Sequence, residues 1–206
     1  MTDKRIADLP SLVSPENVDE LVCVDVSDTT SSAQGTTKKI TIQNLFNKTN
    51  FFGWANYSDS QYTAVSPLPI SSGTRTLITN NTGGTSTNET YLNEAASLWN
   101  NDALQPVAIG DTYDVRISFY CTPATNDQDI TLDLDIGTGG SPIKIYEETR
   151  RMLKGAGQVN SFVFAIPIFA LDTFFINGGR FYITPSSNIT LYGTTIFITK
   201  TFRNIS

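Results

Sequence analysis

The sequence contains no histidine and few charged residues. None of its 206 residues is a histidine, and Asp, Glu, Lys and Arg together make up 17%. Catalytic triads, Cys–His dyads and most catalytic zinc sites need an imidazole, so the sequence excludes them. The two cysteines, Cys23 and Cys121, have no redox or metal-binding spacing, and we expect two buried free thiols. We therefore expect a protein that is not an enzyme, with no catalytic residue, no cofactor and no metal site.

Positive charge and long apolar runs are also scarce. The net charge is −6, and between Thr76 and Ile143 the only cation is Arg116, against nine carboxylates. Nucleic-acid phosphates need clustered Lys and Arg, so we expect no nucleic-acid partner. No apolar run is long enough to span a bilayer, and no apolar signal segment follows the polar stretch Met1–Arg5. We therefore expect no membrane association and synthesis in the cytoplasm.

The residues that are abundant favour β-structure. Thr, Ser and Asn dominate the polar part of the chain, and Tyr113–Cys121 and Ile130–Ile136 carry apolar side chains at every second position. This period of two is typical of strands with one buried face. Further strands are predicted at Thr74–Thr79, Lys144–Glu148, Phe162–Phe169, Phe174–Ile176, Arg180–Thr184, Ile189–Tyr192 and Thr194–Phe202. About eight strands predict an all-β fold, an antiparallel jelly-roll sandwich.

We expect three regions along the chain. Residues 1–46 hold two short strand patterns, Leu21–Val26 and Lys38–Ile42, joined by a polar loop, which predicts a small N-terminal β-hairpin segment. Residues 47–61 are punctuated by Gly, Asn and Ser and are predicted to be a linker, although Trp54 and Tyr57 lie within it. Residues 62–206 are predicted to form the jelly-roll domain.

One predicted strand does not alternate. Every residue of Phe162–Phe169 is apolar, which is typical of a strand buried on both faces. A symmetric neighbour in a homotrimer could supply the second covering layer; the alternative is a strand that bends at Pro167 between two sheets. On the first interpretation, the residues expected at the oligomer interface are Phe162, Phe164, Ile166, Phe169 and Phe174.

Two polar or aromatic groups could carry other functions. Asp133 and Asp135 lie on one face of one strand, about 7 Å apart, which fits the carboxylate spacing of inverting glycosidases. We interpret them instead as a solvated strand face, and the spacing of Asp127, Asp129, Asp133 and Asp135 lacks a calcium-loop pattern. Aromatic rings could stack on sugars, and the candidates for this are Trp54, Tyr57, Tyr62 and Trp99.

The first 46 residues resemble a leader found in bacteriophage fibre and virion proteins. Arg5–Pro10 contains I-x-x-L-P, Asp19–Val26 contains E-L-V-x-V, and Thr37–Leu45 matches T-K-K-(I/V)-T-(I/L)-x-x-L, in the order and spacing of that leader. The resemblance implies that this segment attaches the protein to a virion. A two-stranded hairpin is marginal alone, so its apolar residues need a covering surface. The residues expected to dock are Ile6, Leu9, Leu21, Val22, Val24, Ile40, Ile42 and Leu45.

Together these observations predict a non-enzymatic bacteriophage virion structural protein, made in the host cytoplasm. A typical tail fibre has a long shaft after its leader, and no shaft follows here, which favours a short trimeric fibre or a capsid decoration protein. Its expected partners are two further copies of the chain and other virion proteins of the capsid or tail. The alternative is a carbohydrate-binding module that recognises a receptor, with a host-surface glycan as its ligand.

Overall fold

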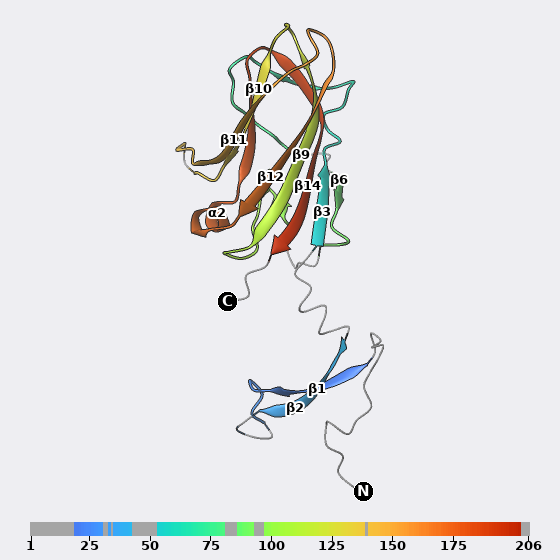
Figure 1. Ribbon diagram of the computed structural model, residues 1–206, viewed down its shortest axis with the longest axis vertical. Helices are drawn as coiled ribbons and strands as arrows, with labels where there is room; N and C mark the ends of the chain where they lie inside the picture. Colours follow the sequence, from blue (N-terminus) through green and yellow to red (C-terminus); the bar gives the residue numbers. More distant parts are fainter. Residues whose placement is uncertain are drawn as a thin grey trace. The chain divides into compact units, whose positions relative to one another are not determined.

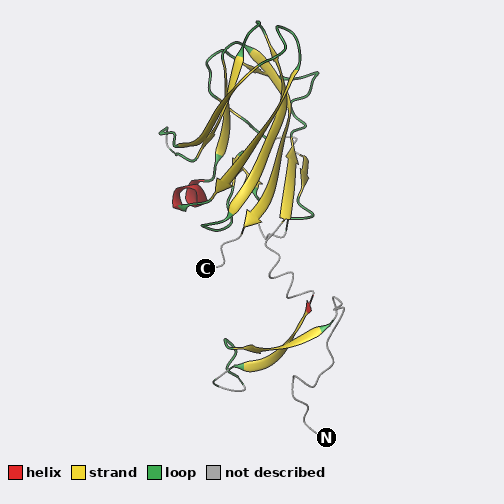
Figure 2. Cartoon of the chain, viewed as in Figure 1, coloured by secondary structure: helices red, strands yellow, loops and turns green. Residues whose placement is uncertain are grey.

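The computed structural model describes residues 19–30, 33, 35–42, 53–80, 86–92, 97–138 and 140–202. The chain divides into two compact units, Met1–Asn50 and Phe51–Ser206. Strands account for nearly all the regular structure in both units (Figure 2). Within the described ranges there is no helix that could traverse a bilayer.

The first unit contains the predicted hairpin. Strand β1 (Glu20–Asp25) pairs antiparallel with β2 (Thr36–Thr41) over six residue pairs. Lys38 forms ion pairs with Asp25 and Asp28 at 3.1 and 2.8 Å, and these tie the loop to the second strand. Side-chain hydrogen bonds from Ser27 and Lys38 lower the pKa of Asp25 to about 2.

The second unit is a sandwich of two antiparallel sheets (Figure 1). The large sheet has the strand order β12-β9-β14-β3-β6, with β4 also paired to β14, and the small sheet has the order β11-β10-β13-β5. The large sheet is built from β3 (Gly53–Ser58), β4 (Leu68–Ile70), β6 (Ser86–Asn88), β9 (Thr112–Pro123), β12 (Asn160–Phe169) and β14 (Ile189–Phe202). The small sheet is built from β5 (Thr76–Leu77), β10 (Asp129–Asp135), β11 (Lys144–Arg151) and β13 (Arg180–Pro185). A short pair, β7 (Trp99–Asn100) with β8 (Ala103–Leu104), lies outside both sheets.

The route of the chain through these sheets is that of a jelly roll. Strands β3, β5, β9 and β10 alternate between the large and the small sheet, and so do β11, β12, β13 and β14. β10 and β11, which follow each other directly, form a hairpin within the small sheet. These eight strands, with β4 and β6 added to the large sheet, therefore form two layers around one core, and the predicted all-β jelly-roll sandwich is confirmed.

The alternating segments supply the core as predicted. The side chains of Tyr113, Val115, Ile117 and Phe119 on β9 are at most 1% exposed. Their neighbours on the same strand point outward, so the strand has one buried and one solvent-facing side. The alternating residues Ile130, Leu132 and Leu134 of β10 cover them from the small sheet, with no exposed surface.

The predicted linker is wrong where it overlaps β3. Residues 53–58 pair with β14 over six residue pairs and form an interior strand of the large sheet. Ala55 and Tyr57 are fully buried in the core. Gly53 and Asn56, which suggested a linker, are strand residues here, because burial of Ala55 and Tyr57 outweighs their weak strand propensity.

The apolar strand β12 alternates between a buried and an exposed side, which corrects the predicted interface. Phe162, Phe164 and Ile166 are at most 7% exposed because they point into the core of their own sandwich. The residues between them face outward, and Val163 and Phe169 are 52% and 63% exposed. The interface assigned to the three inward residues is therefore wrong, whereas Phe169 remains available to a partner. β12 also does not bend between sheets, since it pairs with β9 over ten residue pairs.

The strand predicted at Phe174–Ile176 is also wrong, because these residues lie in the short helix α2 (Asp172–Asn177). Asp172 lies in its first turn, where a carboxylate is favourable, and Gly178 ends it with a φ of 69°. Phe174 is 1% exposed and packs in the core. It therefore cannot contribute to an oligomer interface. Four of the five predicted interface residues are thus core residues, and Phe169 is the exception.

The two cysteines should differ sharply in reactivity. Both are free thiols, but only Cys121 is buried as expected, while Cys23 on the hairpin is exposed. Burial raises the pKa of Cys121 to about 12, which keeps it protonated and unreactive. Iodoacetamide should therefore add to one cysteine in the native protein and to two in denaturant, as read by intact mass. Two rapid additions under native conditions would contradict the burial of Cys121.

Candidate functional site

The outer face of the small sheet carries a charged cluster in place of the solvated face predicted from the sequence. Asp133 and Asp135 point away from the core on β10, yet their side chains are only 1% and 8% exposed. Arg75, which immediately precedes β5, covers them. The prediction of a solvated strand face is therefore wrong, because it could not foresee a cation delivered from a distant part of the chain.

The guanidinium of Arg75 holds both carboxylates. Its Nε donates to Asp133 at 3.0 Å, its Nη2 donates to the same carboxylate, and Nη2 also donates to Asp135 at 2.9 Å. The guanidinium lies 3.7 Å from the ring centroid of Tyr182 on β13, in cation–π geometry. Lys144 approaches Asp133 at 3.8 Å and forms a second ion pair with Glu147. The hydrogen bonds with Asp133, and less strongly the one with Asp135, raise the pKa of Arg75.

Asp135 also anchors the loop between β10 and β11. One of its oxygens accepts hydrogen bonds from the backbone N–H groups of Gly137 and Ile143, both at 2.8 Å. Burial alone would raise the pKa of Asp135, but these two bonds and Arg75 outweigh it and lower the pKa. A Cβ on Gly137 would lie 2.1 Å from the carbonyl oxygen of Ser141, so only glycine allows the loop to close this tightly.

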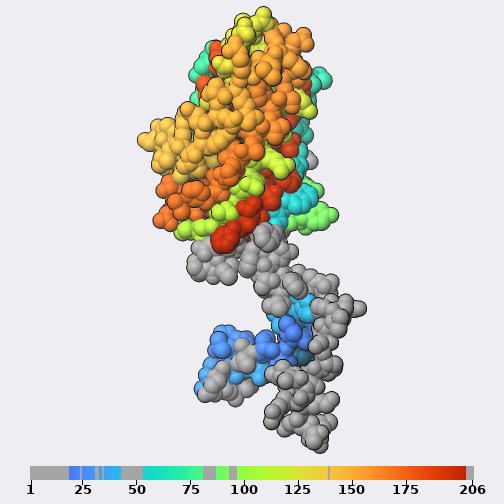
Figure 3. Space-filling model, in the orientation of Figure 1, coloured from blue at the N-terminus to red at the C-terminus, as the bar shows by residue number. Residues whose placement is uncertain are grey.

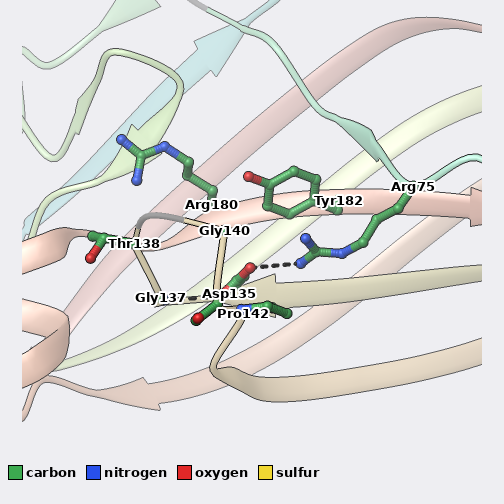
Figure 4. A pocket seen from close by; sticks show the side chains of 9 residues that line it. Arg75, Asp135, Gly137, Thr138, Gly140, Pro142, Arg180 and Tyr182 are labelled. Carbon is green, nitrogen blue, oxygen red and sulfur yellow. Dashed lines mark hydrogen bonds and ion pairs between the residues drawn. The ribbon is translucent and has the colours of Figure 1, made fainter.

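A pocket of about 370 Å³ opens between this loop and strand β13. Figure 4 shows Arg180, Tyr182 and Arg75 on one side of it and the loop residues on the other. The lining residues are Arg75, Asp135, Gly137, Thr138, Gly140, Ser141, Pro142, Arg180 and Tyr182. No sequence pattern marks this pocket, since Arg75 and Arg180 are isolated cations more than 100 residues apart.

Asp127, Asp133 and Asp135 do not converge on a common point. Asp127 forms an ion pair with the exposed Arg151 at 3.0 Å, while Asp133 and Asp135 hold Arg75. In the part of the chain that the structure describes, no group of three or more acidic, His or Cys side chains is arranged for a metal ion. The lining of the pocket offers guanidinium, hydroxyl and backbone groups for hydrogen bonding and charge pairing.

The outer face of the large sheet carries exposed and half-buried aromatic rings, which we call the aromatic face: Trp54, Tyr91, Tyr120, Tyr192 and Phe197. Trp54 stacks on Tyr91 and on Phe197, with ring centroids 5.0 and 5.5 Å apart. Tyr120 and Tyr192 are cross-strand partners whose rings stack at 5.3 Å. In the space-filling view the surfaces of β12, β9, β14 and β3 adjoin one another on one face (Figure 3).

A backbone irregularity in β14 supports this face. Gly193 separates the two segments predicted as individual strands, Ile189–Tyr192 and Thr194–Phe202, which are in fact one strand. Its φ is 64°, and a Cβ at this position would lie 3.2 Å from the ring of Tyr120. Glycine therefore gives the bulge its positive φ and leaves room for the stacked tyrosines.

The four aromatic residues proposed to stack on sugars lie in different environments. Tyr57 and Trp99 are core residues, at most 3% exposed, and cannot present a ring face to a ligand. The hydroxyl of Tyr57 donates to Glu89 and accepts from the backbone N–H of Leu98, which fixes it inside the unit. Tyr62 and Trp54 are half-buried, and Trp54 belongs to the aromatic face.

The predicted docking residues are only partly within the described ranges. Ile6, Leu9 and Leu45 and the side chain of Val24 lie outside them. Leu21 and Val22 on β1 are 44% and 73% exposed. Ile40 and Ile42 are half-buried. The hairpin therefore presents apolar side chains to solvent, as a segment that needs a covering surface would.

The sequence matches no known family model, and no curated protein matches it. Among solved structures, the Eiger TNF of S. frugiperda is 11% identical, with a TM-score of 0.47 over 75% of this chain and 96% of that chain. The globular domain of the zebrafish complement 1qA protein is 10% identical, with a TM-score of 0.41 over 74% and 98%. The PRD1 vertex protein P5 is 13% identical, with a TM-score of 0.38 over 73% and 96%. Similarities this distant indicate no function, and the jelly-roll assignment follows from the strand order.

Proposed function

We propose that the chain is a non-enzymatic structural protein of a bacteriophage particle, a short trimeric appendage that docks through its first unit. The observation that carries the proposal is the division into a small hairpin unit and a self-contained jelly roll. The hairpin coincides with the segment that resembles the leader of phage fibre and virion proteins. A separate leader and a compact head suit a protein that is anchored at one end and exposed at the other.

The hairpin has the properties of a docking element. Its two strands cannot bury Leu21 and Val22, so these side chains gain a covered environment only when a partner surface meets them. The charges nearby are largely satisfied within the hairpin, because Lys38 and Lys39 pair with Asp25, Asp28 and Glu20. Binding should therefore rest on apolar burial and backbone pairing, and should persist at high salt.

The aromatic face is the proposed contact between the three copies. Among the described residues that form it, Tyr91 and Tyr120 are 62% and 45% exposed. Tyr and Trp are enriched at protein interfaces because they bury much apolar area at a small cost in side-chain entropy. Asp114 and Arg116 are both exposed on the outer side of β9, so identical copies can bring opposite charges together. Phe169 at the end of β12, one of the residues expected at the interface, is exposed on the outer side of the same sheet.

Particles that lack the native protein provide the test of docking. We expect the full chain to bind them and a truncated chain of residues 51–206 to remain folded but unbound, as counted by quantitative gel analysis of pelleted particles. In the full chain, Val22→Asp should also abolish binding, because it places a charge in the apolar contact. The matched control is Val65→Asp at a position 95% exposed in the jelly-roll unit, which should bind normally.

Equal binding of the truncated and full chains would show that the jelly roll carries attachment and would overturn the docking role of the hairpin. Loss of binding when salt is raised would show instead that charge pairing dominates. Full binding of Val22→Asp would exclude β1 as part of the contact.

A further inference from the structure

We propose that the pocket between β13 and the β10–β11 loop binds a sugar that carries a carboxylate, such as a uronic acid. The carboxylate would pair with Arg180, and the loop and Tyr182 would hydrogen-bond the sugar hydroxyls. This binding site is independent of how the chain attaches to a particle, so the two proposals fail separately.

Arg180 is the cation of the pocket that is left to a ligand. Its cross-strand neighbour is Asp135, but both oxygens of that carboxylate are engaged, one by Arg75 and the other by two backbone N–H groups. Among the described residues no carboxylate lies within ion-pair distance of Arg180. Its hydrogen bond to the carbonyl oxygen of Asn177 is long at 3.5 Å. A guanidinium without a carboxylate partner is suited to bind the carboxylate of a ligand through two parallel hydrogen bonds.

The charges around the pocket favour a single anionic group over a polyanion. Asp133 and Asp135 lie beneath Arg75 and pair with it, and Lys144 pairs with both Asp133 and Glu147. Arg180 therefore provides one positive charge at the wall. The chain as a whole has a net charge of −6 and would repel a strand of phosphates.

The remaining lining is suited to a hydroxyl-rich molecule. Thr138 and Ser141 contribute hydroxyl groups, Gly137 and Gly140 leave backbone groups accessible, and Tyr182 contributes a phenol. Pro142 contributes apolar surface to the lining. The volume of about 370 Å³ falls in the range of roughly 300–1,000 Å³ typical of small-molecule sites.

The walls are held in place before any ligand arrives. Arg75 is fixed by two carboxylates and by the ring of Tyr182, and the loop is fixed through Asp135. Little side-chain or loop ordering is therefore needed on binding, which lowers its entropic cost.

The test is a titration of the full chain, followed by NMR or calorimetry, with glucuronate, galacturonate, the neutral sugars glucose and galactose, and acetate. We expect at least one uronate to bind about tenfold or more tightly than its neutral counterpart and than acetate. Arg180→Gln should weaken that binding about tenfold or more, because glutamine keeps hydrogen bonding but loses the charge. Arg151→Gln, an exposed arginine on the same sheet, is the matched control and should bind as the unmodified chain does.

Three results would overturn the proposal. Equal affinity for the neutral sugar would remove the role of the carboxylate, and equal affinity for acetate would remove the role of the sugar. Unchanged binding by Arg180→Gln, with the fold verified by circular dichroism, would place the ligand elsewhere. The particle-binding assay reports on docking alone, so its outcome is independent of this titration.

Discussion

Replacing Arg75 with alanine should lower the free energy of unfolding of the jelly-roll unit by about 3 kcal/mol. The change removes the cation that covers Asp133, whose side chain is only 1% exposed and would be left as a buried carboxylate without its main partner. Removing one member of a buried ion pair usually costs about 3–5 kcal/mol. The lower end applies here because Arg75 is 30% exposed and Lys144 lies 3.8 Å from Asp133.

Thermal unfolding at a fixed protein concentration measures this loss. A change of about 3 kcal/mol in a unit of this size lowers the melting temperature by roughly 6–12 °C. Arg151→Ala is the control, because its ion pair with Asp127 joins two exposed side chains and should contribute about 1 kcal/mol or less. Equal effects of the two substitutions would show that the cluster around Arg75 contributes no more than a surface pair.

A double-mutant cycle isolates the interaction itself. Asp133→Asn removes the charge but leaves Arg75 paired with Asp135, so its own effect should be smaller than that of Arg75→Ala. In the Asp133→Asn background, Arg75→Ala should cost less, because the carboxylate that most needs the cation is gone. Simple additivity of the two effects would contradict direct coupling between these side chains.

Sequence patterns predicted the parts of the fold that are decided locally. The apolar residues of β9 and β10 alternate strictly along the sequence, and this pattern shows which side of each strand faces the core. The hairpin of the first unit was also evident, from two short strand patterns and a polar loop. In these segments local periodicity and tertiary burial favour the same structure, so the pattern suffices.

The errors have the opposite cause, since they fall where a distant contact decides the outcome. Gly53 and Asn56 weaken the strand pattern of residues 53–58 and predict a linker there. Pairing with β14, some 140 residues later, outweighs the low strand propensity of these two residues. The uniformly apolar run Phe162–Phe169 predicts a strand that is buried on both sides. In the structure one side of β12 faces the core and the other side is exposed at the edge of the large sheet. The charged pocket was missed because Arg75, Asp135 and Arg180 meet only through the pairing of β10 with β13 and of β13 with β5.

Placing an arginine at the centre of the aromatic face should dissociate the proposed trimer. Phe197 on β14 stacks on Trp54 at 5.5 Å, and the guanidinium of Arg116 lies 5.9 Å from its ring. Phe197→Arg replaces the central ring with a second positive charge beside Arg116. Burying that charge between copies would require its desolvation without a partner, which opposes association strongly. The dissociation constant should rise by about 100-fold or more, the effect expected of an interface hot spot.

Sedimentation velocity at micromolar concentration separates the outcomes. The unmodified chain should sediment as a trimer and Phe197→Arg as a folded monomer, because residue 197 points outward from the sheet and its replacement leaves the core intact. Thr149→Arg adds the same charge on the outer side of the small sheet, where Thr149 is exposed, and should remain trimeric. A monomeric unmodified chain would exclude the homotrimer, and a trimeric Phe197→Arg would place its interface elsewhere than on the aromatic face. If Thr149→Arg sedimented as a monomer while Phe197→Arg remained a trimer, the contact between copies would lie on the small sheet, because only that surface is changed in Thr149→Arg.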